Sequence, residues 1–126
     1  MSHIDEYAEE VKERWGNSKA YRQSQARTSR YTHADFEAAK KDQEAVTELF
    51  VNAFGNKLAT NSSEAQLAVV AHRTAITKWF YDCSIDMQKN LAVMYIEDSR
   101  FKAYYESRVQ GLAQYVHDCI ICQPGD

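Results

Sequence analysis

Five side chains in this sequence could do chemistry beyond packing. Cys83 offers a thiol, which is a nucleophile once it is ionised. His72 carries an imidazole of the kind that ligates haem iron. His117, Cys119 and Cys122 lie close together near the end of the chain, as in a metal or redox cluster. The chemistries to weigh are therefore nucleophilic attack by a thiolate, haem ligation, and metal or redox binding.

The spacing of these residues favours structural roles. Cys119 and Cys122 form one Cys-Ile-Ile-Cys pair without the second pair of a structural zinc site. Unpaired cysteines, and histidines on apolar helical faces, are commonly core residues. No paired base, oxyanion donor or second carboxylate supports catalysis. We expect no metal, no cofactor and no enzyme activity, and keep as the alternative a small redox or haem-type helical protein that uses His72 or Cys83.

The residues around His72 and Cys83 are typical of binding. Bulky aromatic and sulfur-containing side chains are concentrated in two successive segments, and such side chains line large apolar pockets. The same helical spacing also suits a plain hydrophobic core, so spacing alone does not separate the two. The residues concerned are Ile76, Trp79, Phe80, Met87, Leu91, Met94 and Tyr95.

Length and composition indicate one soluble domain. The 126 residues, 44% hydrophobic and 26% charged, fit a single domain over 1–126. A net charge of -3 provides no basic field for a phosphate backbone, so we expect no direct binding of nucleic acid. The sequence shows no signal peptide and no apolar run of membrane-spanning length. The three cysteines fit reduced thiols, and we expect a cytoplasmic protein that does not bind membranes.

The scarcity of turn residues predicts long helices. The sequence has four glycines and one proline, and no segment alternates with the two-residue period of a strand. We therefore predict an all-α fold of about five to seven helices. Thr32 and Asp35 resemble a capping box, Gly55 a glycine C-cap, and Asn61 or Ser62 a further N-cap. The predicted helices cover about 4–15, 18–28, 32–55, 61–79, 83–97, 98–105 and 111–122.

Helical spacing also predicts which side chains face inward. The helix that ends at Trp79 has His72 and Ile76 on one side and Leu67 and Val70 on the other, so we expect it to be the most buried element. The inner stripe of 32–55 is Ala39, Val46, Leu49, Phe50 and Ala53. The inner stripe of 83–97 is Cys83, Met87, Leu91 and Met94.

The first 31 residues differ in composition from the rest. Residues 17–30 are rich in Ser, Gln, Arg and Thr and have little to bury, so we expect this N-terminal part to be mobile. Tyr7, Trp15, Tyr21 and Tyr31 are dispersed along it. These aromatics either close over a bound ligand or pack on the helical core, and the sequence favours neither.

Several motifs, taken in order, resemble one family. They are Glu9-Glu10-Val11-Lys12-Glu13-Arg14-Trp15-Gly16-Asn17, Ala20-Tyr21-Arg22-Gln23-Ser24, Arg27-Thr28, Tyr31-Thr32, His72-Arg73, Trp79-Phe80-Tyr81, Met94-Tyr95, Arg100-Phe101 and Gly111-Leu112-Ala113. Together they resemble the TipAS domain, the antibiotic-recognition domain at the C-terminus of certain MerR-family transcriptional activators. The resemblance covers nearly the whole chain.

The resemblance implies a globin-like helical fold without haem that binds bulky, apolar antibiotics such as thiopeptides. It also implies that residues 1–31 form a mobile lid over a helical core of residues 32–126. No helix-turn-helix or coiled-coil zipper is apparent in the sequence, so a MerR DNA-binding unit is missing from these residues. We expect either an effector domain separated from that unit or a free-standing protein that sequesters drug.

The resemblance bears on Cys83 as well. Similar thiopeptide-binding members hold a cysteine at the position of Cys83 and a second one seven residues on, where this chain has Asn90. We therefore expect reversible rather than covalent capture. The predicted ligand-binding residues are Tyr7, Trp15, Tyr21, Tyr31, His72, Ile76, Trp79, Phe80, Cys83, Met87, Asn90, Leu91, Met94 and Tyr95.

Overall fold

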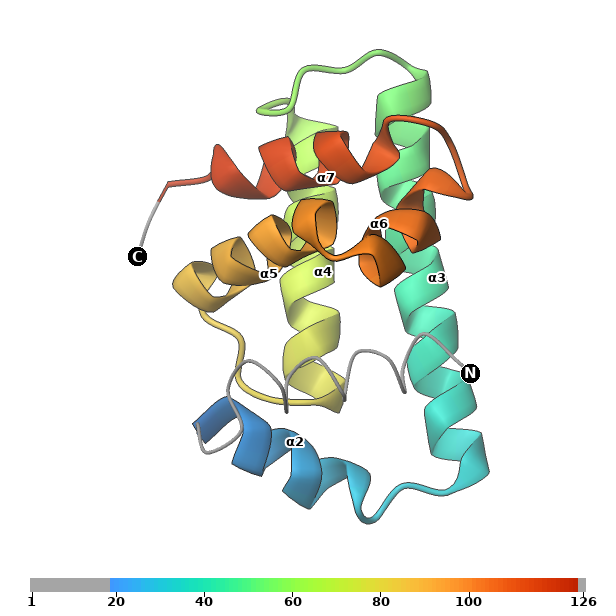
Figure 1. Cartoon of the computed structure of the whole chain (residues 1–126), viewed down its shortest axis with the longest axis vertical. Helices are drawn as coiled ribbons and strands as arrows, with labels where there is room; N and C mark the ends of the chain where they lie inside the picture. Colours follow the sequence, from blue (N-terminus) through green and yellow to red (C-terminus); the bar gives the residue numbers. More distant parts are fainter. Residues whose placement is uncertain (1–18, 125–126) are drawn as a thin grey trace.

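The computed structural model describes residues 19–124, which form six α-helices and the segments that connect them (Figure 1). No strand occurs within these residues, so the predicted all-α class is confirmed. The helix predicted over 4–15 lies outside the described residues. The helices are α2 (Lys19–Thr28), α3 (His33–Gly55), α4 (Ser63–Trp79), α5 (Ile85–Glu97), α6 (Ser99–Glu106) and α7 (Leu112–Ile121).

The helices α3 and α4 form an antiparallel pair, and α7 packs against both of them. Figure 1 shows α4 returning beside α3 after the connection over 56–62. The helices α5 and α7 pack against each other and cross α4, and α6 packs on both α5 and α7. The helix α2 contacts α4 near the C-terminal end of α4. The C-terminal end of α4, with Trp79 and Phe80, therefore lies next to α2.

Hydroxyl side chains set where α3 and α4 begin. The backbone N–H of Asp35 donates to Thr32 Oγ1 at 3.2 Å, and the N–H of Thr32 donates to Asp35 Oδ2 at 3.0 Å. This is the predicted capping box, which pairs N–H groups that the first turn leaves unpaired. Ser62 rather than Asn61 caps α4, and its Oγ accepts from the N–H of Ala65 at 3.2 Å.

The end of α3 differs from the prediction. Gly55 is still helical, the C-cap is Asn56, and the left-handed residue is Lys57, with φ 57°. The N–H of Leu58 donates to the Ala53 carbonyl and that of Lys57 to the Phe54 carbonyl, both at 3.0 Å, which is a Schellman motif. The predicted Gly55 cap was therefore wrong. Leu58, which packs against the core, takes the apolar position of this motif and so places the left-handed residue at 57.

The helix α5 starts two residues later than predicted. Ser84 is its N-cap, and Ser84 Oγ accepts from the N–H of Met87 at 3.1 Å. Cys83 precedes the helix, and its N–H donates to Thr77 Oγ1 at 3.1 Å. The predicted stripe of α5 is therefore wrong in its first member, because the Ser84 hydroxyl caps the helix after Cys83.

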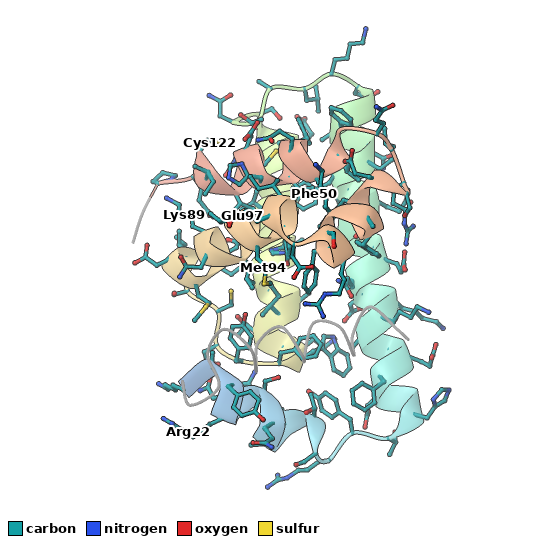
Figure 2. The ribbon with its side chains drawn as sticks, viewed as in Figure 1. Arg22, Phe50, Lys89, Met94, Glu97 and Cys122 are labelled. Atoms are coloured by element: carbon teal, nitrogen blue, oxygen red, sulfur yellow. The ribbon has the colours of Figure 1, made fainter. Side chains whose placement is uncertain are left out.

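The core lies where α3, α4, α5, α6 and α7 meet. Phe50 and Met94 are fully buried, and Figure 2 shows both between the ribbons of these helices. Leu49 was predicted inside, but it is 44% exposed. The inner stripe of α3 is therefore narrower than its apolar sequence indicates.

The burial of α4 was also overestimated. Its inner residues His72 and Ile76 are buried as predicted, but Leu67 and Val70 on the other side are 66% and 46% exposed. The helix α4 therefore has apolar residues on two sides, but only the side with His72 and Ile76 is buried.

Glu106 caps α7 from outside the helix. Gly111, at the N-cap with φ 91°, has no side chain to offer. The Glu106 carboxylate instead accepts from the N–H of Gly111 at 2.9 Å and from the N–H of Ala113 at 3.0 Å. These two backbone bonds hold the pKa of the Glu106 carboxyl below its usual value.

We expect Glu106→Ala to lower the free energy of unfolding at pH 7 by about 0.5–2 kcal/mol, as for the loss of other helix caps. Because the folded-state pKa is the lower one, this stabilisation is present above the ordinary carboxyl pKa of 4.5 and is lost as the pH falls through the folded value. Urea unfolding of the parent and of Glu106→Ala at pH 7 and at pH 3 measures this stabilisation. Glu48→Ala, on the exposed face of α3, is the control. An equal loss at both pH values would contradict the assignment.

Candidate ligand-binding site

A small cavity lies between α3, α4 and α5. Its volume is about 30 Å³, room for about one water and far below the ~300–1,000 Å³ of sites for drug-sized ligands. Its walls must therefore move apart before a bulky ligand can enter. The lining consists of Ala39, Gln43, Val46, His72, Ala75, Ile76, Trp79, Phe80 and Tyr95.

The structure brings some of the predicted site residues together and separates others. His72, Ile76, Trp79, Phe80 and Tyr95 line the cavity. The remaining residues are in other places. Leu91 and Met94 are fully buried core residues, Tyr21 and Met87 pack against the core, and Asn90 is exposed. Tyr31 and Cys83 are treated below, and Tyr7 and Trp15 lie outside the described residues.

Four lining residues are absent from the predicted set: Ala39, Gln43, Val46 and Ala75. The first three share one face of α3, at positions i, i+4 and i+7. Ala39 and Val46 belong to the predicted inner stripe of this helix, and Gln43 falls on the same face. That shared face was the available signal, but helical spacing does not say that α3 lies opposite the aromatic end of α4.

Both ring nitrogens of His72 are hydrogen-bonded within the protein. Nε2 lies 2.9 Å from the Tyr95 hydroxyl, and Nδ1 lies 2.8 Å from Nε2 of Gln88. The Gln88 amide also donates to the Val69 carbonyl at 2.9 Å. Gln88, His72 and Tyr95 are all buried. His72 therefore holds two helices together, which supports the structural role over haem ligation.

Arg73 sets the orientation of the Gln88 amide. Arg73 Nη1 donates to Gln88 Oε1 and to Gln123 Oε1, both at 3.0 Å. A guanidinium can only donate, so the amide oxygen of Gln88 faces Arg73 and its nitrogen faces His72. Nδ1 of His72 is then the acceptor, and Nε2 carries the proton that it donates to Tyr95. Through this network a wall of the cavity is tied to Gln123, beyond the end of α7.

Trp79 is held at the edge of the cavity by its neighbours. Its indole N–H donates to Asp42 Oδ2 at 2.7 Å, and this bond, with that from Lys78, lowers the pKa of the Asp42 carboxyl. The Tyr31 ring packs edge-on against Trp79, with 5.7 Å between ring centroids. The Tyr31 hydroxyl also donates to the Trp79 carbonyl. Trp79 therefore connects the cavity wall with the segment that follows α2.

Polar contacts join α2 to Asp82, just after α4, and α2 also buries Ala20 and Ser24. Asp82 accepts from Arg27 Nη2 at 2.9 Å and from Gln23 Nε2 at 3.3 Å. Arg27 donates in addition to the Thr77 carbonyl. Asp82 is exposed, and exposed ion pairs contribute little to stability. A conformational change can therefore break these contacts with Asp82 at small cost.

Cys83 is a buried thiol beside the site rather than in the lining of the cavity. Its Sγ lies 3.6 Å from the Ser84 carbonyl, and burial raises its pKa to about 12. Cys119 is also buried, and burial raises its pKa to about 12 as well. Both thiols are protonated at neutral pH, whereas nucleophilic attack needs the thiolate. Both are therefore poor nucleophiles in this structure.

We expect Cys122, the exposed cysteine, to be the one thiol that reacts rapidly with an alkylating reagent in the folded protein. Peptide mapping by mass spectrometry after brief treatment with iodoacetamide at neutral pH identifies the labelled residue. All three cysteines should react in guanidinium chloride, and Cys122→Ser should abolish the rapid reaction. Rapid labelling of Cys83 in the folded protein would contradict the assignment.

The side chains of His117, Cys119 and Cys122 do not form a metal site in the described structure. Within residues 19–124 no group of three or more His, Cys, Asp or Glu side chains is placed to hold a metal ion. His117 lies 2.8 Å from the carboxylate of Asp118, and Cys122 Sγ lies 3.3 Å from the Cys119 carbonyl. The described helices also include none that is long and apolar enough to cross a membrane.

Comparison with known proteins groups this chain with a family of regulators. The family model of the TipAS antibiotic-recognition domain matches residues 7–122. The HTH-type transcriptional activators TipA of Streptomyces coelicolor and Streptomyces lividans are 38% identical over 117 residues, which is 93% of this chain and 46% of theirs. The HTH-type transcriptional activator mta of Bacillus subtilis is 30% identical over 119 residues, 94% of this chain and 45% of its own. The chain thus spans just under half the length of these relatives.

A solved structure agrees with the sequence relatives. TipAS from Streptomyces lividans, in complex with nosiheptide, matches with a TM-score of 0.83 and 37% identity over 95% of this chain and 84% of that one. The resemblance predicted from the sequence motifs is thereby confirmed, and this chain belongs to the family of TipAS antibiotic-recognition domains.

Proposed function

We propose that this chain recognises bulky, apolar antibiotics of the thiopeptide class and binds them reversibly at the cavity between α3, α4 and α5. The observation that carries the proposal is the match to a TipAS domain that holds nosiheptide. The mainly apolar lining, with Trp79 and Phe80, supports it. A protonated Cys83 and an exposed asparagine at position 90 favour noncovalent binding over covalent capture. The domain thus acts by binding and not as an enzyme.

Ligand entry requires the walls to move, and we place that movement at α2 and Trp79. The contacts of Arg27 and Gln23 with Asp82 are exposed and easily broken. The cavity edge at Trp79 is in turn covered by Tyr31. We propose that residues 19–31 belong to a lid that opens for the drug and closes over it, with apolar burial offsetting the ordering of the segment.

We propose drug sensing as the biological role. The named relatives are transcriptional activators about twice the length of this chain. In such a protein, a drug that binds the activating state more tightly would shift the population toward it. Without a DNA-binding unit, the same binding would sequester the drug. Both roles need the same site, and both place the protein in the cytoplasm.

We expect nosiheptide to stabilise the folded chain by about 2.7 kcal/mol at a free concentration 100 times its Kd. The measurement is a thermal unfolding series at increasing nosiheptide, with isothermal titration calorimetry for Kd and mass spectrometry for adducts. A ribosome-binding antibiotic that is small and polar, such as a simple aminoglycoside, serves as the control ligand. No stabilisation at saturating nosiheptide would remove the proposed function, and an adduct on Cys83 would replace reversible by covalent capture.

The lid has its own test. Amide hydrogen exchange in residues 19–31 is expected to slow when nosiheptide binds, because closure excludes water from their backbone hydrogen bonds. The amides of α7, which the proposal leaves in place, are the internal control. Unchanged exchange in 19–31 at saturating drug would contradict the lid and leave drug binding itself intact.

A further inference from the structure

Four residues bring polar atoms to the cavity wall: Gln43, His72, Trp79 and Tyr95. The side chains of His72, Trp79 and Tyr95 already make hydrogen bonds within the protein. The His72 imidazole bonds to Gln88 and to Tyr95, at 2.8 and 2.9 Å, and the Trp79 indole donates to an α3 carboxylate at 2.7 Å. These bonds orient the wall and use the hydrogen-bonding capacity that a ligand would need.

The Gln43 amide is different. Its side chain makes no hydrogen bond to any other described residue. Its backbone carbonyl, besides its place in the helix, accepts from the Thr47 hydroxyl at 3.0 Å. Gln43 is half-buried and lies between Ala39 and Val46 on the cavity side of α3. No described residue therefore uses its oxygen acceptor or its two N–H donors, which lie on the cavity side of α3, where a ligand would bind.

The remaining wall restricts which ligand groups this amide suits. None of the described residues that line the cavity is Lys, Arg, Asp or Glu. A carboxylate or ammonium group of a ligand would therefore lose water without gaining an opposite charge. A neutral amide, by contrast, presents a donor beside an acceptor and can pair with the glutamine amide through both.

We propose that Gln43 forms a hydrogen-bonding subsite for the amide groups of the bound antibiotic and selects peptide-derived drugs over apolar drugs of similar size. Thiopeptides are built from amino acids and carry such amides. Ala39, Ala75 and Ile76 around the subsite have no polar side-chain atoms, so without Gln43 a ligand amide would be buried unpaired. The inference rests on the proposed antibiotic binding and names a residue that tunes it.

Gln43→Leu tests the subsite, because leucine has a similar size and no hydrogen-bonding atoms. The nosiheptide affinity measured by calorimetry is expected to fall on the order of 10- to 100-fold, the range for a polar group left unpaired. The melting temperature without ligand should change little, since the side chain has no hydrogen-bond partner among residues 19–124 to lose. Gln110→Leu, which replaces an exposed glutamine between α6 and α7, is the matched control and should bind like the parent.

Gln43→Glu supplies a second readout. Near pH 7 the carboxylate accepts but does not donate, so the affinity should fall. As the pH is lowered through the carboxyl pKa, the protonated acid again offers a donor beside an acceptor, and part of the affinity should return. The parent measured over the same pH range corrects for other titrating groups. A purely structural role for residue 43 would not produce this recovery.

The results separate the subsite from the function on which it rests. If the parent does not bind nosiheptide, the proposed function is wrong and the subsite fails with it. If the parent binds and folded Gln43→Leu binds equally well, the subsite is overturned while antibiotic recognition stands. If Gln43→Leu does not fold, Gln43→Glu decides: recovery of affinity at low pH supports the subsite, and its absence overturns it.

Discussion

Replacing Gln88 by leucine is expected to lower the free energy of unfolding by about 3–5 kcal/mol. Gln88 is fully buried and serves the Val69 carbonyl, His72 Nδ1 and the Arg73 guanidinium at once. Leucine would fill the space but leave two buried groups, His72 Nδ1 and the Gln123 amide nitrogen, without the partner that Gln88 gives them. It would also remove one of the two acceptors of the Arg73 guanidinium. Each unpaired buried group costs about 1–3 kcal/mol, and more when it is charged. Domains of this kind are stable by about 5–15 kcal/mol in total, so the loss would be a large share.

Guanidinium unfolding followed by far-UV circular dichroism measures this loss. Gln25→Leu on the exposed face of α2 is the control and should change stability by less than about 0.5 kcal/mol. Since His72 lines the cavity, Gln88→Leu should also weaken nosiheptide binding in the fraction that remains folded. A stability loss below about 1 kcal/mol would mean that the network around His72 contributes little.

The second large effect is expected for Ala39→Leu. Ala39 is buried on the α3 wall of the cavity, opposite the aromatic end of α4. The cavity of about 30 Å³ cannot take up the larger side chain together with a bulky ligand. Fitting extra methylene groups into a packed site costs about 1–3 kcal/mol, which corresponds to roughly 10- to 100-fold weaker binding of nosiheptide.

Calorimetry of Ala39→Leu with nosiheptide, combined with a melting curve of the free variant, separates a blocked site from a damaged fold. Ala45→Leu places the same side chain on the exposed side of α3 and should bind like the parent. Parent-like binding by folded Ala39→Leu would show that the drug does not use this cavity.

Much of the local structure could be predicted because its causes are local. Thr32 and Asp35 identified the start of α3, since their capping box lies within one turn. Gly111 marked the start of α7, although the side chain that caps this helix is Glu106. The face of α4 that carries His72, Ile76 and Trp79 followed from helical spacing. The missed Schellman position at Lys57 depended on Leu58 packing against the core, which is a contact with distant residues.

The site was only half predictable for the same reason. Aromatic residues near the end of α4 stood out in the sequence, but Gln43 on α3 did not, because a glutamine on a helix is ordinarily a surface residue. The sequence also showed no sign that Gln88 is important. Its importance comes from Val69, His72 and Arg73, which precede it by 15 to 19 positions in the chain.

The sequence by itself determined the helices, most of their caps and the family, because propensity, capping and motif order act along the chain. The tertiary structure decided which side chains share an environment. Packing buried Cys83 and raised its pKa to about 12, joined both nitrogens of His72 to core partners, and left Leu67 in solvent. Burial and hydrogen-bond partnership depend on residues brought together from distant parts of the chain, and no local pattern specifies them.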